Sequence, residues 1–185
     1  CPTSHWHTNA NRNRQFCQDI LLASFEFRMR IIQQHGHEIR KMSAPKLNQA
    51  FYERETREVA KDLLGKKLVT VSTAGITSGR IVETEAYLPT NDSACHASKH
   101  RTARTEVMFG RAGHAYVYPI HAKHCFNVVT DDIGKGCAVL IRALEPLEGI
   151  ELMQHRRQTV DPLKLTRGPA CLCQALAIDR RYSGL

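Results

Sequence analysis

The stretch IVETEAYL, residues 81–88, places two glutamates and a tyrosine at alternate positions of a pattern typical of a β-strand. Because strand side chains alternate between two faces, the two glutamates and Tyr87 are expected on one face, together with Ile81. Two neighbouring carboxylates repel each other and destabilise an ordinary strand. Their presence therefore indicates either a solvated edge or a reaction centre.

General acid–base chemistry is one use for two carboxylates at this spacing. Alternate residues of a strand lie roughly 7 Å apart, within the range of carboxylate separations in inverting glycoside hydrolases. Glu83 and Glu85 could therefore be the acid and the base of such an enzyme. The strongly basic segment that follows them argues against a neutral sugar as the substrate.

Two polar residues interrupt apolar strands further along the chain. Arg142 follows the apolar run CAVLI, and Asn127 lies within HCFNVVT. A buried arginine needs a paired carboxylate, so Glu83 or Glu85 is its expected partner. A mid-strand asparagine is usually a hydrogen-bonded structural amide, with a role in specificity as the alternative.

Residues 96–124 combine basic side chains with flat rings. The segment holds five Lys or Arg and five His against one acid, together with Tyr116 and Tyr118. Cations interleaved with rings suit a phosphate backbone beside a stacked base, although a solvated basic loop has the same composition. The two tyrosines share a strand face, where they either pack together or line a slot.

A metal site is another chemistry that this segment allows. The candidate ligands are His96, His121, His124 and Cys125, whose spacing fits no standard zinc site. The seven cysteines are scattered and form no C-x-x-C pair, which is typical of reduced thiols in a cytosolic protein. We therefore expect no metal.

The composition indicates a single domain with a polyanionic partner. The chain has 185 residues, a hydrophobic fraction of 42% and a formal net charge of +8. That charge favours nucleic acid or an anionic membrane surface, between which composition alone does not choose. No stretch approaches the roughly 20 apolar residues that span a bilayer.

The candidate residues lie in predicted strands that are flanked by helices. The expected strands are residues 66–72, 80–88, 114–120, 123–130 and 137–144, with a hairpin turn at 73–79 and a loop at 89–113. An amphipathic helix is expected from about Phe51 to Gly65, and Pro146 and Pro169 are expected to begin two more. Without βαβ alternation, this order predicts an α+β domain with a mainly antiparallel sheet.

Several blocks of sequence resemble the alkyladenine (3-methyladenine) DNA glycosylase family. In order, they are GRIVETEAYL, MFGRAGHAYVY, HCFNVV, AVLIRALEPLEGIELM and RGPACLCQALAI. The resemblance implies one α+β domain around a curved antiparallel sheet, without a helix-hairpin-helix. It also implies a base-excision repair enzyme that flips alkylated or deaminated purines out of double-stranded DNA. Such an enzyme hydrolyses the N-glycosidic bond without a metal or other cofactor and leaves an abasic site.

The resemblance assigns roles to the residues that match the family pattern. Glu85 matches the general base that activates water, and Arg142 matches the arginine that helps to hold this water. Glu83 carries no such role in the family. The residues that match the sandwich around the flipped purine are Tyr87, His96 and Tyr118.

Specificity and DNA contacts follow from the same resemblance. Asn127 matches the asparagine that crowds the purine 2-position and disfavours guanine. The family wedge, a tyrosine followed by glycine, falls in IHAKHCFN, which is one residue shorter here, and the nearest match is His121. The basic residues expected along the DNA backbone are Arg101, Arg104, Arg111 and Lys123.

The ends of the chain depart from the family pattern. Residues 1–41 are expected to be a non-core extension or a mis-called start before Met42, and residues 42–185 to be the glycosylase domain. Family members continue beyond the position of Leu185 with strands that complete the sheet, so the domain is expected to be truncated. A catalytically dead fragment that binds lesions is therefore an alternative. We expect a monomer in the bacterial cytosol or nucleoid, or in a eukaryotic nucleus, without a membrane partner.

Overall fold

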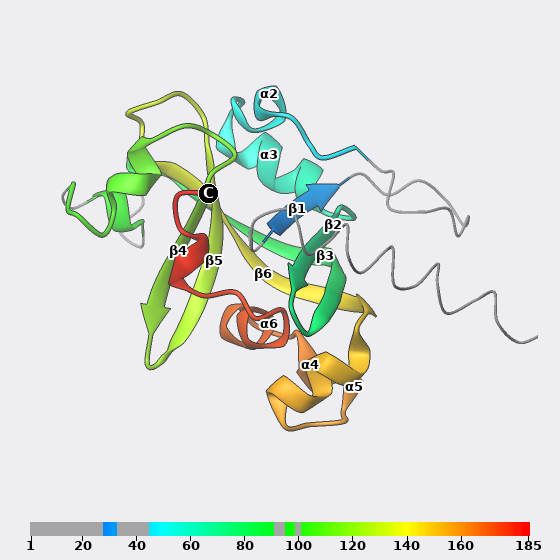
Figure 1. Ribbon diagram of the computed structural model, residues 1–185. Coiled ribbons are helices and arrows are strands. Elements are labelled where there is room, and N and C mark those ends of the chain that lie inside the picture. Colours follow the sequence, from blue (N-terminus) through cyan, green and yellow to red (C-terminus); the bar gives the residue numbers. More distant parts are fainter. Residues whose placement is uncertain (1–27, 33–44, 91–94, 99–100) are drawn as a thin grey trace, which may run out of the picture.

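The computed structural model describes residues 28–32, 45–90, 95–98 and 101–185 (Figure 1). Within these residues, antiparallel strands form a six-stranded sheet in the order β1-β2-β3-β6-β5-β4. The strands are β1 Arg28–Ile32, β2 Lys67–Ser72, β3 Gly75–Tyr87, β4 Ala115–Ile120, β5 Lys123–Thr130 and β6 Cys137–Glu148. The predicted fold class is confirmed, because a curled antiparallel sheet with a few helices makes up one α+β domain.

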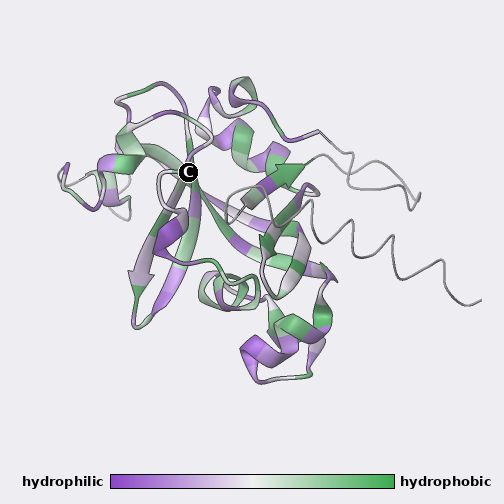
Figure 2. Cartoon of the chain, viewed as in Figure 1, coloured by the Kyte–Doolittle hydropathy of each residue, from purple (hydrophilic) through white to green (hydrophobic). Residues whose placement is uncertain are grey.

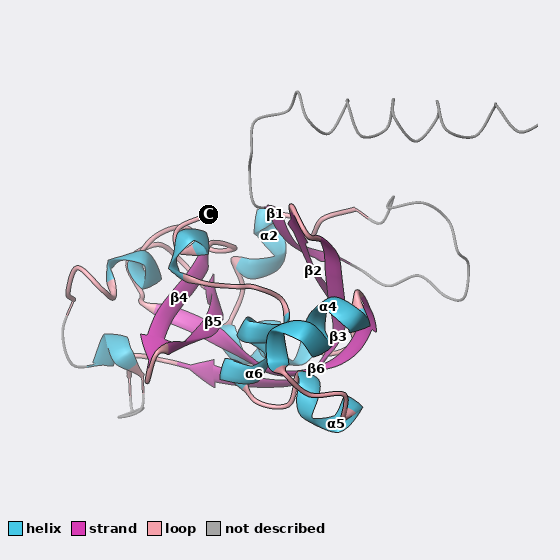
Figure 3. Ribbon diagram, turned by 60° about the horizontal axis from the view of Figure 1, so that its bottom comes forward, coloured by secondary structure: helices cyan, strands magenta, loops and turns pink. Residues whose placement is uncertain are grey.

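The helices lie at both ends of the long central pair β3 and β6. They are α2 Gln49–Tyr52, α3 Thr56–Leu63, α4 Ile150–Arg157, α5 Pro162–Leu165 and α6 Pro169–Ala175. Three further 3-10 turns are η1 His96–Ser98, η2 Glu106–Phe109 and η3 Arg180–Tyr182. Figures 1 and 3 show α4, α5 and α6 grouped together, with α2 and α3 near the other end of the sheet.

The single helix expected from Phe51 to Gly65 is instead two helices. Asn48 caps α2 by accepting a hydrogen bond from the backbone N–H of Phe51 at 3.0 Å. Glu55 then accepts from the N–H of Glu58 at 3.0 Å and begins α3. A side-chain oxygen that satisfies a free N–H starts a new helix even where the apolar period continues.

Two strands are longer than expected. β3 begins at Gly75 within the predicted turn, because β2 pairs with its first half as far as Arg80. β6 continues through Pro146 to Glu148, and the helix that was expected to begin at this proline begins at Ile150. A register shift beside Gly79, the partner of Pro146, gives the ladder the irregularity at which a strand tolerates proline.

The interior divides into a main core and a smaller cluster. The main core joins α3 and α6 to the sheet through residues such as Val59, Leu63, Ile141 and Leu172. The smaller cluster joins Tyr116 on β4 to Met108 and Cys95 of the loop after β3. Figure 2 shows hydrophobic residues in green alternating with hydrophilic residues in purple along the strands.

One strand lies before residue 41. β1 pairs with β2 along its whole length, and Ile31 is buried in the main core. This part of the expected N-terminal extension therefore belongs to the sheet. The boundary at residue 41 stays a prediction, and residues 1–27 and 33–41 lie outside the described residues.

Candidate active site

A row of side chains crosses four strands on one face of the sheet. Glu85 on β3 is the partner of Leu140 on β6, and Leu140 is also the partner of Asn127 on β5. Asn127 in turn pairs with Tyr116 on β4. Because cross-strand partners point to the same face, the antiparallel register aligns a carboxylate, an amide and a ring that lie far apart in the sequence.

The face that carries Glu85 points away from α3. Thr84, its neighbour on β3, donates a hydrogen bond of 2.9 Å to the carbonyl of Ala60 in α3. Successive strand residues alternate, so Glu85 and Tyr87 project from the opposite side. The predicted placement of Glu83, Glu85 and Tyr87 on one face agrees with this arrangement.

The expected alternation fails at Ile81, which is buried in the main core rather than beside the glutamates. The register shifts between Ile81 and Glu83, so Val82 is an extra residue on β3. It shifts back between Glu83 and Thr84, where Arg142 is the extra residue on β6. These bulges change which side chains face outward, and Val82 is half exposed as a result.

Arg142 lies between the two glutamates. Its Nε is 2.8 Å from Oε1 of Glu85 and 3.5 Å from Oε1 of Glu83. The expected pairing with a carboxylate is therefore present, and it involves both candidates. The expectation of a buried arginine is wrong, because 40% of its side chain is exposed. Solvent reaches this pair, as a reaction that consumes water requires.

Glu85 has a second partner on its own strand. The hydroxyl of Tyr87 donates a hydrogen bond of 2.6 Å to Oε2 of Glu85. Both carboxylate oxygens are thus engaged, one by a guanidinium N–H and the other by a phenol. This arrangement holds the carboxylate in one orientation at the edge of the smaller cluster, against which the Tyr87 ring packs.

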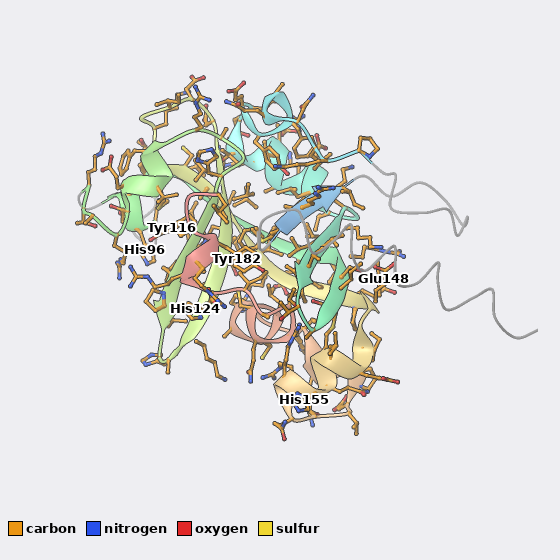
Figure 4. All side chains as sticks on the ribbon, viewed as in Figure 1. His96, Tyr116, His124, Glu148, His155 and Tyr182 are labelled. Carbon is orange, nitrogen blue, oxygen red and sulfur yellow. The ribbon has the colours of Figure 1, made fainter. Side chains whose placement is uncertain are left out.

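Three rings gather beside this carboxylate. His96 lies edge-on to Tyr118 with ring centroids 4.5 Å apart, and its Nδ1 is 3.1 Å from the hydroxyl of Tyr116. Tyr116 and Tyr118 lie 5.5 Å apart, which agrees with the predicted shared face. Figure 4 shows His96 and Tyr116 close together, away from α4. Burial raises the pKa of both tyrosines, so both stay neutral phenols at physiological pH.

Asn127 on β5 is the buried cross-strand partner of Tyr116. Its side chain is buried, with only 3% of the residue exposed, and its Nδ2 donates a hydrogen bond of 3.1 Å to the carbonyl of Tyr116. The amide is therefore a satisfied structural group. It also lies in the same row as Glu85, so both interpretations from the sequence remain compatible with its position.

Cys125 is a site neighbour that the sequence suggested only as a metal ligand. It is the cross-strand partner of Tyr118 and is hydrogen-bonded to its side chain. Burial raises the pKa of this thiol, and the charges of Arg142 and Glu85 act on it as well. The alternation of strand side chains could have indicated this position, because Cys125 precedes Asn127 by two residues on β5 and therefore shares its face.

The basic side chains predicted to contact the DNA backbone differ in whether they already bind an acidic partner. Arg101 binds both carboxylate oxygens of Glu106 and lies 5.0 Å from the centre of the Phe109 ring. This pairing would have to open before Arg101 could bind a phosphate. The remaining candidates, Arg104, Arg111 and Lys123, are exposed.

His121 lies at the tip of the β4–β5 hairpin. His121 and Ala122 form a two-residue turn, both with positive φ, of 43° and 61°. Such a turn suits the twist of the strands but normally favours Asn-Gly rather than these residues. The imidazole is exposed at the tip of this hairpin.

The described part of the chain contains no group of three or more His, Cys, Asp or Glu side chains that could hold a metal ion. His96 and His121, two of the candidate ligands, lie in different elements: the η1 turn and the hairpin tip.

No helix among the described residues is long and apolar enough to cross a membrane.

Comparison with known proteins agrees with the sequence blocks. A model of the methylpurine-DNA glycosylase family matches residues 50–185. Proteins named "Putative 3-methyladenine DNA glycosylase" are similar over most of the chain. The protein of Methanocella arvoryzae is 52% identical over 142 residues, which cover 76% of this chain and 71% of the relative. That of Methanoculleus marisnigri is 57% identical over 136 residues, which cover 73% and 70%.

The fold and these matches together define a hydrolase that acts on N-glycosyl bonds. The chain belongs to the methylpurine-DNA glycosylase family. The resemblance that the sequence blocks indicate is therefore confirmed. The roles of individual residues stay predictions.

Proposed function

We propose that the protein removes alkylated or deaminated purines from double-stranded DNA by hydrolysing the N-glycosidic bond with water that Glu85 activates. The observation that carries this proposal is the position of Glu85. Its Oε1 is 2.8 Å from Arg142 and its Oε2 is 2.6 Å from Tyr87, beside a cluster of aromatic rings. A carboxylate held in this way can face a sugar whose base stacks on the neighbouring rings.

Base recognition requires that the nucleotide leave the duplex. Flipping costs a few kcal/mol, and stacking on aromatic side chains returns roughly 1–3 kcal/mol per base. The side chains that would contact the flipped purine are Tyr87, His96 and Tyr118. An alkylated purine carries positive charge, and the face of a tyrosine ring attracts cations.

The chemistry that follows is dissociative. As the glycosidic bond breaks, the sugar gains positive charge, which the carboxylate of Glu85 stabilises while it takes a proton from the attacking water. Arg142 orients the carboxylate and helps to hold the water. A cationic alkylpurine leaves readily, whereas neutral hypoxanthine has to be protonated as it leaves. The product is an abasic site in an intact strand.

Specificity is the role we propose for Asn127. Its amide is buried, and its hydrogen bond to Tyr116 keeps it from moving aside. A rigid group that faces the purine 2-position would collide with the exocyclic amine of guanine. Adenine derivatives and hypoxanthine lack this amine.

DNA contacts complete the proposal. His121, at the hairpin tip, would enter the gap that the flipped base leaves. The cations that would follow the phosphates are Arg104, Arg111 and Lys123, and Arg101 after it separates from Glu106. We further propose that the protein acts on double-stranded DNA as a monomer.

Two alternatives can be weighed against this proposal. A glycoside hydrolase that uses Glu83 and Glu85 loses support, because one arginine binds both carboxylates and the family match points to DNA. A protein that binds lesions without excision would have the same residues beside Glu85. Only an activity measurement separates it from the enzyme.

The test is incubation with duplex DNA that contains one hypoxanthine or one ethenoadenine. Heating in alkali then cleaves the strand wherever an abasic site has formed. We expect cleavage only after alkali, and none with Glu85→Gln or with undamaged DNA. Tight lesion binding without excision would establish the lesion-binding alternative. Cleavage without alkali would contradict the proposed water nucleophile.

A further inference from the structure

Glu83 is a charged residue of the site face to which the proposed reaction gives no task. Its Oε1 lies 3.5 Å from Nε of Arg142, the same nitrogen that lies 2.8 Å from Glu85. The side chain of Glu83 is 55% exposed, against 39% for Glu85. Glu83 is thus the outer partner and Glu85 the inner partner of one guanidinium.

The backbone brings Glu83 to this position through two irregularities. Val82 is the extra residue on β3 immediately before Glu83, and Arg142 is the extra residue on β6 opposite the step that follows. Because the extra residues lie on opposite strands, the register beyond Thr84 is the same as before Ile81. Bulges beside active sites commonly change the direction of a side chain. Here the two bulges lie on either side of Glu83, at the point where it contacts Arg142.

Glu83 is poorly placed to be a second base. It lacks the tyrosine partner of Glu85 and lies one step further from the rings. It also lines a separate groove of about 550 Å³ together with Pro162 and Leu163 of α5. Its remaining contact with the reaction centre is therefore the one it makes with Arg142.

We propose that Glu83 is a positioning residue that acts through Arg142, an inference that rests on the proposed function. Two carboxylates on one face repel each other, and a guanidinium between them offsets that repulsion. An arginine side chain on an exposed face has many rotamers, and a single carboxylate leaves it free to swing outward. The second carboxylate confines the guanidinium, so that its N–H continues to meet Oε1 of Glu85 when DNA arrives.

The experiment compares the wild type with Glu83→Gln, Arg142→Gln and the double variant. The rate of hypoxanthine excision is measured in a single turnover, and affinity for the same duplex is measured by gel shift. The matched control is Glu145→Gln, because Glu145 lines the same groove, is 53% exposed and pairs with Arg80 instead of Arg142. The thermal midpoint of each variant is recorded alongside.

We expect Glu83→Gln to slow excision about tenfold with unchanged affinity and thermal midpoint. In the Arg142→Gln background, Glu83→Gln should cause no further loss of excision rate, because the arginine through which Glu83 acts is already absent. Glu83→Asp, which keeps the charge, should recover part of the rate, and Glu145→Gln should match the wild type.

Three results would overturn the inference while leaving the proposed function intact. The first is a normal rate in Glu83→Gln. The second is an undiminished effect of this substitution in the Arg142→Gln background. The third is loss of the thermal transition, which would make Glu83 a structural residue. Absence of excision by the wild type would instead overturn the proposed function, and the inference with it.

Discussion

The hydroxyl of Tyr87 donates a hydrogen bond of 2.6 Å to Oε2 of Glu85, two residues earlier on β3. One face of β3 therefore carries both the proposed general base, Glu85, and the ring proposed to stack on the flipped purine, Tyr87. Because Arg142 holds Oε1 at 2.8 Å, the carboxylate has little freedom to rotate. The proposed general base and the proposed stacking ring therefore project from fixed positions on the same strand face.

The first prediction concerns Glu85. Replacement by Gln keeps the shape but removes the base and the negative charge that faces the sugar. We expect single-turnover excision of hypoxanthine to fall at least 10²–10⁴-fold, the range typical of general-base loss. Gel-shift affinity for the lesion should survive, because stacking and phosphate contacts remain. Loss of binding would make Glu85 a structural residue instead.

The second prediction separates the ring of Tyr87 from its hydroxyl. Tyr87→Phe keeps the stacking surface but frees Oε2 of Glu85. A hydrogen bond to a charged group contributes about 1.5–3 kcal/mol, so excision should slow by about tenfold or more. Lesion affinity should be unchanged, whereas Tyr87→Leu should weaken it. Equal loss of affinity in both variants would argue that the hydroxyl serves binding rather than catalysis.

The third prediction concerns Asn127. Asn127→Ser removes the amide proposed to face the purine 2-position, so guanine derivatives should be admitted more readily while hypoxanthine excision falls less. The variant also removes the 3.1 Å hydrogen bond from the side chain to the carbonyl of Tyr116, which should lower the free energy of unfolding by about 0.5–1.5 kcal/mol. Both effects can be read from one preparation. An unchanged ratio of guanine to hypoxanthine release would leave Asn127 with its structural role alone.

The fourth prediction concerns the hairpin tip. A wedge stabilises only the flipped state, so His121→Ala should weaken binding to lesion DNA more than binding to undamaged DNA. Gel shifts with the two duplexes measure the difference. Lys123→Ala, two residues further on, is the matched control and should weaken both duplexes to a similar extent. Equal losses in His121→Ala would mean that His121 contacts phosphate and does not enter the helix.

The fifth prediction concerns β1. Ile31 is only 5% exposed and packs in the main core, so Ile31→Ala should lower the free energy of unfolding by about 2 kcal/mol, the low end of the range for core truncations. Denaturant titration measures the change. Arg30→Ala, on an exposed neighbour in the same strand, should have little effect. No difference between the two variants would mean that β1 contributes little to stability.

Local sequence patterns predict the bounds of an element correctly where the pattern fits only one kind of secondary structure. β5 was expected at residues 123–130 and runs from Lys123 to Thr130, because its apolar side chains have no competing helical period. For β3 the sequence predicts a strand that begins too late, at residue 80, because Thr77, Ser78 and Gly79 have the composition of a turn. Pairing with β2 and β6 on its two sides overrides that local preference.

The sequence by itself determined the fold class, the family and the kinds of side chain available for chemistry. Only the tertiary structure decided that Arg142 contacts both glutamates, that Cys125 adjoins Tyr118, and that Ile81 leaves the face of Glu83. The physical reason is register. A bulge of one residue reverses which face a side chain occupies, and the pairing of distant strands is chosen by the packing of the whole sheet rather than by any local pattern.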